Sequence, residues 1–456
     1  MKKGFPFILA AFFLLSFTPT VTLSHDETLL KKYCTFSRYT QFMNADSFSS
    51  VYPPHIFDNR RVIACGESSH GSHENQLIKT AMFRYLAEKE NVRVFILEAS
   101  YAEVMTVNDY IHGKEIPPDS AMHSTSFWVW RTQEIRDLIE WMRNFNKGKT
   151  AAQQLYFLGM DMQEIRSAAK RSLEFFTLYD PSGSSKAKTL LQPFTTDTFY
   201  RIMRFPAEKK QQRMKNLASV DSLAALVPVP ADPAAKEDFL LALHEISVLR
   251  QSFQFSAFLG PRGFVERDSA MAENVKWIAG NISPGHPVFV CAHNEHVAVK
   301  RYNFMKKYPY ASTGALLRDF FGDAYYSIGV DFTTGSFNAL TFPGRKSLKN
   351  LRDIATGKAM FEGPMPCNFE KKFRHTLFFH VAKYNSWMTW VNCDAAKNDP
   401  ALMKSKLLRK ENVIHSIGAG FLWESACLAA TEFGKEFDSF LFFKRSTPSW
   451  ILHDPL

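Results

Sequence analysis

The stretch from residue 62 to residue 74, VIACGESSHGSHE, joins a short apolar run to a cluster of polar side chains. Similar apolar runs occur at 92–97, 155–158, 288–291 and 326–330, with helical segments between them. Short continuous apolar strands that alternate with helices are typical of a parallel sheet buried on both faces. The sequence therefore predicts an α/β fold, with a central, mostly parallel sheet flanked by helices.

Helical periodicity follows the first of these strands. Apolar residues recur at helical spacing from Leu77 to Leu86, which predicts one apolar face, and Lys79 is expected on the opposite, polar face. A second helix is expected after Thr132, which is placed as its N-cap. Both helices are expected to support the sheet.

Residues 163–281 show helical periodicity and no strand signal. An insertion of this size between two strands is predicted to form a helical subdomain or lid. The expected division is therefore an N-terminal part of the α/β catalytic domain at 25–162, the helical insertion or lid at 163–281, and the C-terminal part of the catalytic domain at 282–456.

The N-terminus predicts the compartment. Residues 1–24 open with two lysines, continue with an apolar run at 5–17 and then turn polar. This layout is typical of a secretory signal peptide, and the run is too short to cross a membrane as a helix. No later run approaches ~18 apolar residues, so no membrane span is expected after cleavage. We expect an exported chain, periplasmic or secreted, with an uncleaved membrane anchor as the alternative.

The six cysteines would enter an oxidising compartment after export, where disulfides are possible. Cys65 and Cys291 lie inside apolar runs and are expected to be buried free thiols. The spacing of the other four does not define a pairing, and no zinc pattern is present.

The charge balance gives no nucleic-acid signature. Lys and Arg outnumber Asp and Glu by 55 to 45, for a formal net charge of +10. The basic residues are scattered, and no helix-turn-helix, zinc-finger or RNP pattern accompanies them. We expect a solvated surface and no nucleic-acid partner.

Carboxylates or imidazoles follow four of the predicted strands. Glu67 and His70 come after the first strand, Glu98 ends the second, Asp161 ends the third, and His293 comes after the fourth. In parallel α/β sheets, ligands bind at the carboxyl ends of the strands. These positions therefore predict an active site at that edge of the sheet.

The predicted chemistry is acid and base catalysis. A neutral histidine oriented by carboxylates takes a proton from water near pH 7, and the activated water attacks a carbonyl carbon. His70 is predicted to be this base, with Glu67 and Glu98 fixing its tautomer and holding its charge. His293 or Arg131 is expected to stabilise the oxyanion or to donate a proton to the leaving group.

Two other kinds of site can be compared with this one. A nucleophilic serine favours Gly-x-Ser-x-Gly after a strand, and GESSH at 66–70 lacks the second glycine. A metal site is an open alternative, because zinc ligands are present but no His-Glu-x-x-His or deaminase motif is. No cofactor is therefore predicted, with a divalent metal as the alternative. The candidate ligands are His70, His73, His293, His296 and Glu98.

The motifs as a set resemble the erythromycin esterase family in order and spacing. They are GESSHGSHE at 66–74, LEAS at 97–100, FWVWRT at 127–132, GMDMQ at 159–163, RD at 267–268, MAEN at 271–274 and AHNEH at 292–296. Ile417, Gly418, Phe421 and the segment 437–443 are similar to the closing segments of that family. The resemblance extends from about residue 58 to the end, and the set is far more specific than any single motif.

The resemblance implies a hydrolase that opens the macrolactone ester of erythromycin-type antibiotics without a covalent serine intermediate. The family's water-activating histidine corresponds to His70, the glutamate of the same motif to Glu67, the strand-end glutamate to Glu98, and the Ala-His-Asn histidine to His293. Arg131 and Arg267 match family arginines. Because some members are known as exopolysaccharide biosynthesis proteins, a macrolide is a narrower expectation than an ester or lactone.

A second set of residues is predicted to bind the substrate, a small-molecule ester or lactone. Structural roles are the alternative, with His73 and His296 supporting the fold and Glu74 and Asp161 interacting with the start of a helix. Two further functions stay open: a metal-dependent hydrolase of peptide or ester bonds, and an envelope binding protein without turnover. The predicted binding residues are Arg267, Asp161, His73, Glu74 and His296.

Overall fold

The computed structural model describes most of the 456-residue chain. The described residues are 23–42, 48–52, 55–257, 261–304, 308–341, 362–370, 376–384, 386–405, 407–408 and 412–452. The predicted signal peptide at 1–24 lies outside them, apart from its last two residues.

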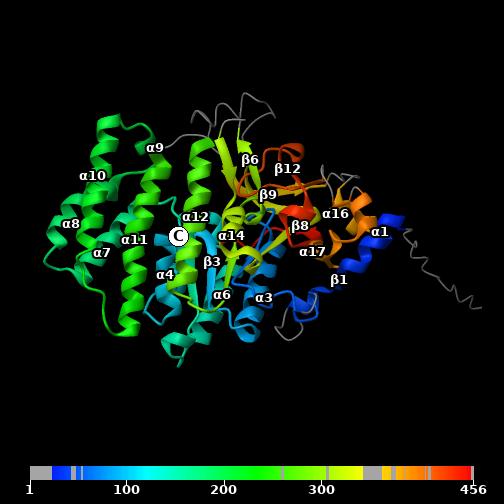
Figure 1. Ribbon diagram of the computed structural model, residues 1–456, viewed down its shortest axis with the longest axis horizontal. Coiled ribbons are helices and arrows are strands. Elements are labelled where there is room, and N and C mark those ends of the chain that lie inside the picture. Colours follow the sequence, from blue (N-terminus) through cyan, green and yellow to red (C-terminus); the bar gives the residue numbers. More distant parts are fainter. Residues whose placement is uncertain are drawn as a thin grey trace, which may run out of the picture.

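Nine described strands form one large sheet, which is the centre of the fold (Figure 1). The strands from β13 to β4 run parallel, whereas antiparallel pairs join β1, β10 and β9 to the sheet. Two small antiparallel pairs, β6 with β7 and β11 with β12, lie outside it. The spatial order is β1 (Cys34–Ser37), β10 (Met388–Asn392), β13 (Ser439–Ser446), β8 (Tyr325–Thr341), β2 (Val62–Cys65), β5 (Val288–Cys291), β3 (Val94–Ser100) and β4 (Tyr156–Asp161), with β9 (Glu362–Phe369) on β8; the outer pairs are β6 (Arg301–Phe304), β7 (Tyr308–Ala311), β11 (Asn412–His415) and β12 (Leu428–Thr431).

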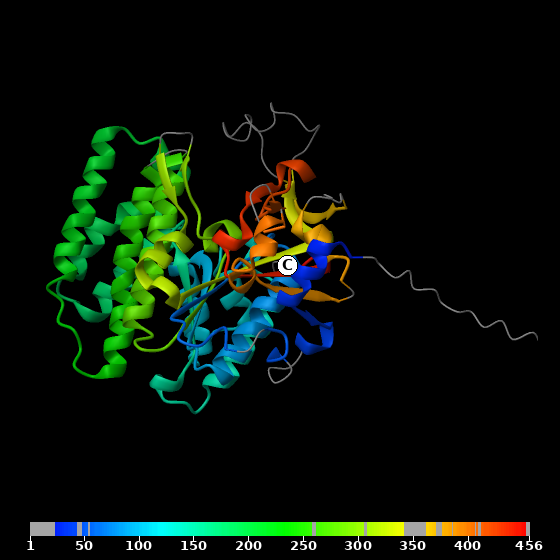
Figure 2. The same ribbon diagram turned by 45° about the vertical axis from the view of Figure 1, so that its right-hand side comes forward.

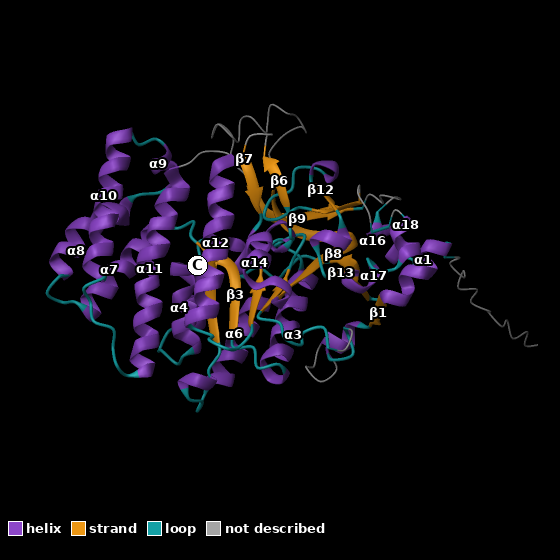
Figure 3. Ribbon diagram, viewed as in Figure 1, coloured by secondary structure: helices purple, strands orange, loops and turns teal. Residues whose placement is uncertain are grey.

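Helices cover both faces of this sheet, as Figure 3 shows. The predicted α/β class, with a mostly parallel sheet flanked by helices, is confirmed. The described helices are α1 (His25–Leu30), α3 (His73–Lys89), α4 (Tyr101–Ile111), α5 (Pro118–His123), α6 (Gln133–Asn146), α7 (Ile165–Tyr179), α8 (Ser184–Leu191), α9 (Phe199–Met203), α10 (Ala207–Ala224), α11 (Pro233–Ala257), α12 (Pro261–Asn281), α13 (Asn294–Val297), α14 (Thr313–Phe321), α16 (Leu377–Val381), α17 (Cys393–Ala396), α18 (Pro400–Lys404) and α19 (Phe433–Glu436).

The apolar runs become central strands because both faces of the sheet are covered. In β2, Val62 and Ala64 belong to one buried cluster, and Ile63 and Cys65 belong to another on the opposite face. The first cluster includes apolar residues of α7, α11 and α12, and the second includes those of α3 and α6. A strand with two apolar environments needs a continuous apolar run rather than an alternating one.

Helices alone connect β4 to β5, and this segment runs from α7 to α12. These helices stand together beside the sheet, at the left of Figures 1 and 2. The longest, α11, contacts both α7 and α12. Because α12 also contacts β4, the helical segment packs directly against the edge of the sheet.

Two local expectations can be compared with the helices themselves. Thr132 is the N-cap of α6, with its side chain accepting a hydrogen bond from the Ile135 backbone N–H, as predicted. Lys79 was predicted on the polar face of α3, and this prediction is wrong because its side chain is fully buried. Lys79 has a buried carboxylate as its partner, which explains how the charge is accommodated.

The structure bears on two further predictions, one about the cysteines and one about membrane-spanning helices. All six cysteines are free thiols in the structure, and Cys65 and Cys291 are buried, as expected. Among the described residues, no helix is both long enough and apolar enough to cross a membrane.

Gly71 provides a test of this packing. A Cβ atom there would lie 1.9 Å from the Asn338 carbonyl oxygen, while the Gly71 carbonyl accepts hydrogen bonds from Asn338 and Ser449. We expect Gly71→Ala to lower the free energy of unfolding by about 1–3 kcal/mol through overpacking. Gly280→Ala is the matched control, because a Cβ at that exposed helical position meets nothing within 4 Å. It should raise stability by up to about 1 kcal/mol in urea unfolding, and equal effects of the two changes would contradict the packing.

Candidate active site

The loop after β2 carries the first pair of predicted site residues, and the structure brings them into contact. His70 Nδ1 lies 2.8 Å from Glu67 Oε1, and the other carboxylate oxygen of Glu67 lies 2.6 Å from Lys79 Nζ. Glu67 and Lys79 are fully buried, and His70 is 8% exposed. The three side chains therefore form a continuous buried chain from α3 to the imidazole.

Local backbone contacts hold this loop in place. Ser72 caps α3 by accepting from the Asn75 backbone N–H, and the Gln76 side chain donates to the His70 carbonyl oxygen. Gly66 lies so close to Asn294 that a Cβ would be 2.1 Å from the Asn294 amide oxygen. A glycine at this position allows the turn after β2 to pass beside the loop after β5.

The groups around Glu67 determine whether its carboxyl is ionised. Burial alone would raise the pKa of Glu67, but the charges of Lys79 and His70 outweigh burial and hold the pKa below its usual value. Glu67 is therefore an ionised acceptor, so His70 Nδ1 carries a proton and donates it. The remaining ring nitrogen of a neutral His70, Nε2, then has a free lone pair.

His293 follows β5 and faces His70, with a distance of 5.8 Å between the ring centroids. Burial lowers its pKa to about 4, and neighbouring His70 acts in the same direction, so the ring is neutral at neutral pH. Its Nδ1 accepts a hydrogen bond from the Glu295 backbone N–H at 3.3 Å. The ring proton of His293 therefore lies on Nε2, which is buried and has no hydrogen-bond partner in the structure.

Gly418 lies beside both rings. A Cβ at this glycine would be 3.9 Å from His70 Nε2 and 4.0 Å from His293 Cδ2, and the backbone there has a φ of +58°. Its carbonyl oxygen accepts from the His70 backbone N–H, and its N–H donates to the Ser68 carbonyl. The position thus combines a left-handed backbone with an absence of side-chain bulk next to the two imidazoles.

The loop that carries Gly418 begins at another buried histidine. His415 Nδ1 lies 2.7 Å from Asp331 Oδ1, and both residues are fully buried. The ring stacks between Phe332 and Phe378, with centroid distances of 4.6 and 5.0 Å. This pair connects β8 to the segment that reaches the active site three residues later.

Glu98 and Asp161, at the ends of β3 and β4, share one cation. Arg267 Nη2 lies 2.7 Å from Glu98 Oε1 and 2.6 Å from Asp161 Oδ2. The second oxygen of Glu98 accepts from the His293 backbone N–H at 2.7 Å. Burial opposes ionisation of Glu98, but His296 and Arg267 hold its pKa well below the usual value. Glu98 therefore supports His293 rather than contacting His70.

His296 extends this network toward α12. Its Nδ1 lies 2.8 Å from Asp268 Oδ1, and its Nε2 lies 3.3 Å from Glu98 Oε1. Burial would lower the pKa of His296, but the two carboxylates outweigh it and raise the pKa to about 10. Asp268 also accepts hydrogen bonds from Tyr310 and Thr313. The network thus fixes the ends of β3 and β4 against α12.

Arg131 and its neighbour Trp130 have different surroundings. Arg131 donates through Nε to the Thr125 carbonyl and through Nη2 to the Ser126 carbonyl, at 2.8 and 3.3 Å. These contacts tie the guanidinium to the preceding loop. Trp130 packs edge-on against the His70 ring at 5.2 Å, and Lys79 Nζ lies 5.1 Å from its centroid. The structure therefore brings Trp130 to the base, while the catalytic role of Arg131 stays a prediction.

His73 and Glu74 contact the C-terminal segment. His73 Nδ1 lies 2.7 Å from Glu134 Oε1, and its ring stacks on Trp450 at 5.2 Å. Glu74 accepts from the backbone N–H and hydroxyl of Thr447. These contacts join α3 to α6 and to the end of the chain, and substrate binding by the two residues stays a prediction.

The metal alternative can be compared with this geometry. Within the described parts of the chain, no three His, Cys, Asp or Glu side chains are grouped so that they can hold a metal ion. His70 and His293 face each other, but the nearby Glu98 already contacts Arg267, His296 and the His293 backbone. The described residues therefore offer two imidazoles rather than a ligand set of the usual zinc kind.

Comparison with known proteins places this arrangement in a family. A family model described as erythromycin esterase matches residues 87–446. The chain belongs to the erythromycin esterase family. Esterase family membership makes it a hydrolase that acts on ester bonds. The matched segment begins after Glu67 and His70, so the roles of these two residues rest on the motif resemblance and on the geometry above.

Two relatives resemble the chain in sequence, and two solved structures resemble it in fold. The chain is 25% identical over 320 residues to erythromycin esterase type II of Escherichia coli, covering 65% of this chain and 74% of the relative. It is 21% identical over 331 residues to the putative hydrolase YbfO of Bacillus subtilis, covering 67% and 72%. A succinoglycan biosynthesis protein shares the fold with a TM-score of 0.75 at 17% identity, over 95% of this chain and all of the other. A mutant of the erythromycin esterase EreC in its open conformation has a TM-score of 0.65 at 13% identity, over 91% and 98%.

Several residues of this site were not identified from the sequence. Lys79 follows the helical repeat as an ordinary polar position and carried no local signal. Asp331 directly follows the predicted strand at 326–330, as Glu98 and Asp161 follow theirs, so the strand-end signal was present and was not used. His415 belongs to no recognised motif. Trp130 and Asp268 were visible as parts of larger motifs, but only the fold shows what each contacts.

Replacing Lys79 tests the buried contacts between Lys79, Glu67 and His70. We expect Lys79→Met to lower the free energy of unfolding by about 3–5 kcal/mol, because it leaves the buried Glu67 charge without its main partner. Lys435→Met is the control, since Lys435 pairs with Glu432 at 3.1 Å on the surface and its side chain is 73% exposed. That change should cost less than about 1 kcal/mol. A similar small effect of both variants in denaturant unfolding would contradict the account.

The neutral state of His293 predicts a pH dependence of stability. Its pKa is about 4 in the folded chain against 6.5 for an ordinary histidine, so the unfolded chain binds a proton in this window that the folded chain does not. Its contribution to stability therefore falls as the pH is lowered from 6.5 to 4, by about 3 kcal/mol in total. The groups that face it are His70, Glu295, Glu98 and His296.

The matched variant for this prediction is His293→Asn, because asparagine also caps a helix but does not titrate. Relative to the unmodified protein, it should gain about 3 kcal/mol of stability between pH 7 and pH 4, measured by urea unfolding. If the two proteins show parallel pH dependence, His293 does not have the low pKa described here.

Proposed function

We propose that this protein hydrolyses a carboxylic ester or a macrolactone with a water molecule activated by His70, without a serine nucleophile. The main support for the proposal is that the hydrogen bonds of the two facing imidazoles leave opposite kinds of ring nitrogen free. His70 presents a free Nε2 lone pair, and His293 presents an Nε2–H that has no partner in the structure. One ring is thus prepared to accept a proton and the other to donate a hydrogen bond.

The reaction follows from these roles. His70 Nε2 takes a proton from water as the water oxygen attacks the carbonyl carbon, and Glu67 stabilises the imidazolium that forms. The His293 Nε2–H donates to the oxyanion of the tetrahedral intermediate, as a neutral imidazole can. The intermediate then breaks its bond to the alkoxide oxygen, and His70 returns the proton to that oxygen. The products are a carboxylic acid and an alcohol, which stay joined if the substrate is a lactone.

The serines of the loop support water as the nucleophile. Among the described residues, the buried Ser68 hydroxyl has no hydrogen-bond partner, and the Ser69 hydroxyl accepts from the Gly71 backbone N–H. A serine nucleophile is normally hydrogen-bonded to its base. Neither hydroxyl has such a contact with His70 or His293 among the hydrogen bonds of the described residues.

We further propose that the enzyme is exported, with residues 1–24 as a cleaved signal peptide and a periplasmic or secreted mature chain. The support is the order of charged, apolar and polar residues in that segment. Its substrate is then an ester or lactone present in that compartment. An erythromycin-type macrolactone is one such substrate, supported by the family and by the name of the Escherichia coli relative.

Hydrolysis can be tested by mass spectrometry of erythromycin and a panel of lactones and simple esters incubated with the mature protein. We expect a product heavier by one water, or a separated acid and alcohol. His70→Ala should lower kcat/KM about 100-fold to 10,000-fold, since it removes the base, and His293→Ala about 100-fold to 1,000-fold, since it removes the donor. Full activity of His70→Ala on a substrate would refute the proposed role.

Two controls belong to this experiment. His55→Asn should leave activity unchanged, because His55 is an exposed surface residue paired with Asp58, and its φ of +62° is one that asparagine tolerates. Treatment with a chelator should also leave activity unchanged. Activity lost on chelation and restored by a divalent metal would select the metal-dependent alternative.

A further inference from the structure

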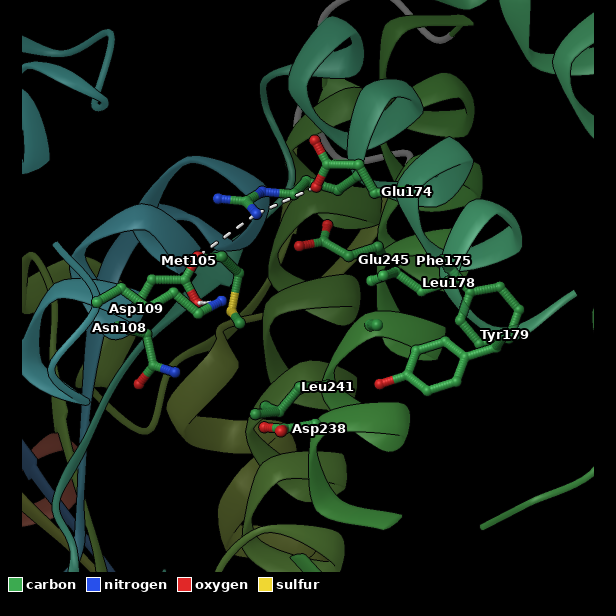
Figure 4. A pocket seen from close by; sticks show the side chains of 13 residues that line it. Met105, Asn108, Asp109, Glu174, Phe175, Leu178, Tyr179, Asp238, Leu241 and Glu245 are labelled. Carbon is green, nitrogen blue, oxygen red and sulfur yellow. Dashed lines mark hydrogen bonds and ion pairs between the residues drawn. The ribbon is translucent and has the colours of Figure 1, made fainter. Parts of the chain in front are cut away.

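A cavity in the helical segment plays no part in the proposed reaction. It has a volume of about 190 Å³ and lies between α4, α7 and α11 (Figure 4). Its walls include the buried side chains of Met105, Phe175 and Leu241. Two of the residues that line it are largely exposed, Leu178 at 70% and the side chain of Lys114 at 64%. No residue of the catalytic loops after β2 and β5 lines it.

Glu245 is the unusual group in this cavity. It is 2% exposed, and both carboxyl oxygens are buried without a hydrogen-bond partner in the structure. Figure 4 shows its side chain leaving α11 and pointing into the space toward α4. Burial raises the pKa of Glu245 well above its usual value, which favours the neutral carboxyl in the empty protein. A buried carboxyl with no partner is unfavourable, and a ligand that pairs with it would remove that cost.

The other charged groups determine which ligand the cavity favours. Arg171 lies 3.2 Å from Glu174 and 3.7 Å from Asp109, and Lys114 lies 2.8 Å from Asp109. Both cations are therefore already paired, whereas Glu245 makes no hydrogen bond among the described residues, although the charge of Arg171 attracts its carboxylate form. An anion would find no free cation here, and it would be repelled by the carboxylates at the rim. A cation meets an unpaired carboxyl in a space lined by both apolar and charged side chains.

We propose that this cavity binds a small organic amine as its ammonium ion, with the nitrogen on Glu245 and the apolar body against Met105, Phe175 and Leu241. The apolar walls favour an organic cation over a metal ion, and no metal-ligand group occurs among the described residues. Formation of the ion pair requires Glu245 to release its proton to the solvent as the ammonium ion enters. The proposal is independent of the ester hydrolysis described above.

The test is isothermal titration of the full-length protein with benzylammonium chloride at pH 7. We expect saturable binding, with about one proton released for each ligand bound, as measured in buffers of different ionisation enthalpy. Benzyl alcohol has the same body without the charge and should show no binding. Absence of benzylammonium binding, or binding without proton release, would overturn the proposal.

Two variants locate the binding. Glu245→Gln should weaken benzylammonium binding at least tenfold, while its thermal midpoint stays close to that of the unmodified protein, because an amide and a protonated carboxyl are similar in shape and both are neutral. Glu273→Gln removes an exposed carboxylate on α12 and should leave the affinity unchanged. Binding that survives Glu245→Gln but is lost in His293→Asn would place the amine in the catalytic site and overturn the proposal.

Discussion

The buried contact between Lys79, Glu67 and His70 is the interaction on which the account of this site depends. A carboxylate with no exposed surface stays ionised here largely because an ammonium group lies 2.6 Å away, with His70 acting in the same direction, and an ionised Glu67 is what fixes the proton of His70 on Nδ1. Removing either partner would leave an uncompensated buried charge, which is among the more costly defects in a protein core. The same contact thus joins the stability of α3 to the chemistry of the loop before it.

At the ends of β3 and β4, buried carboxylates likewise lie against a cation. His296 and Arg267 hold the pKa of the buried Glu98 well below its usual value, and Arg267 also contacts Asp161. Glu98 in turn accepts a hydrogen bond from the backbone of His293. A carboxylate therefore contacts each of the two histidines, but at a different group. Glu67 accepts from the ring of His70, whereas Glu98 accepts from the backbone of His293 and leaves the ring to be oriented by the Glu295 N–H. That difference produces a base and a donor from the same residue type.

The sheet and the edge that carries the site could be predicted from the sequence, because the central strands are short continuous apolar runs. The runs at 62–65 and 288–291 coincide with β2 and β5, because a strand buried on both faces shows itself as a continuous apolar run. The polar residues that follow these strands were identified for the same reason, since parallel strands bring their carboxyl ends to one edge. Lys79 and His415 were missed, because their buried partners are set by tertiary contacts that helical or strand periodicity does not reveal. Asp331 stands directly after a predicted strand and could have been identified by the same rule as Glu98. Gly418 was seen only as part of a family segment, and its place beside both imidazoles required the fold.

The proposed chemistry requires His70 and His293 to carry their ring protons on opposite nitrogens, and nitrogen-15 NMR of histidine-labelled protein at pH 7 measures this. Signals can be assigned by their loss in His70→Gln and His293→Asn. The account predicts a protonated Nδ1 and an unprotonated Nε2 for His70, and the reverse for His293. A protonated Nε2 on His70, or a doubly protonated His293, would contradict it.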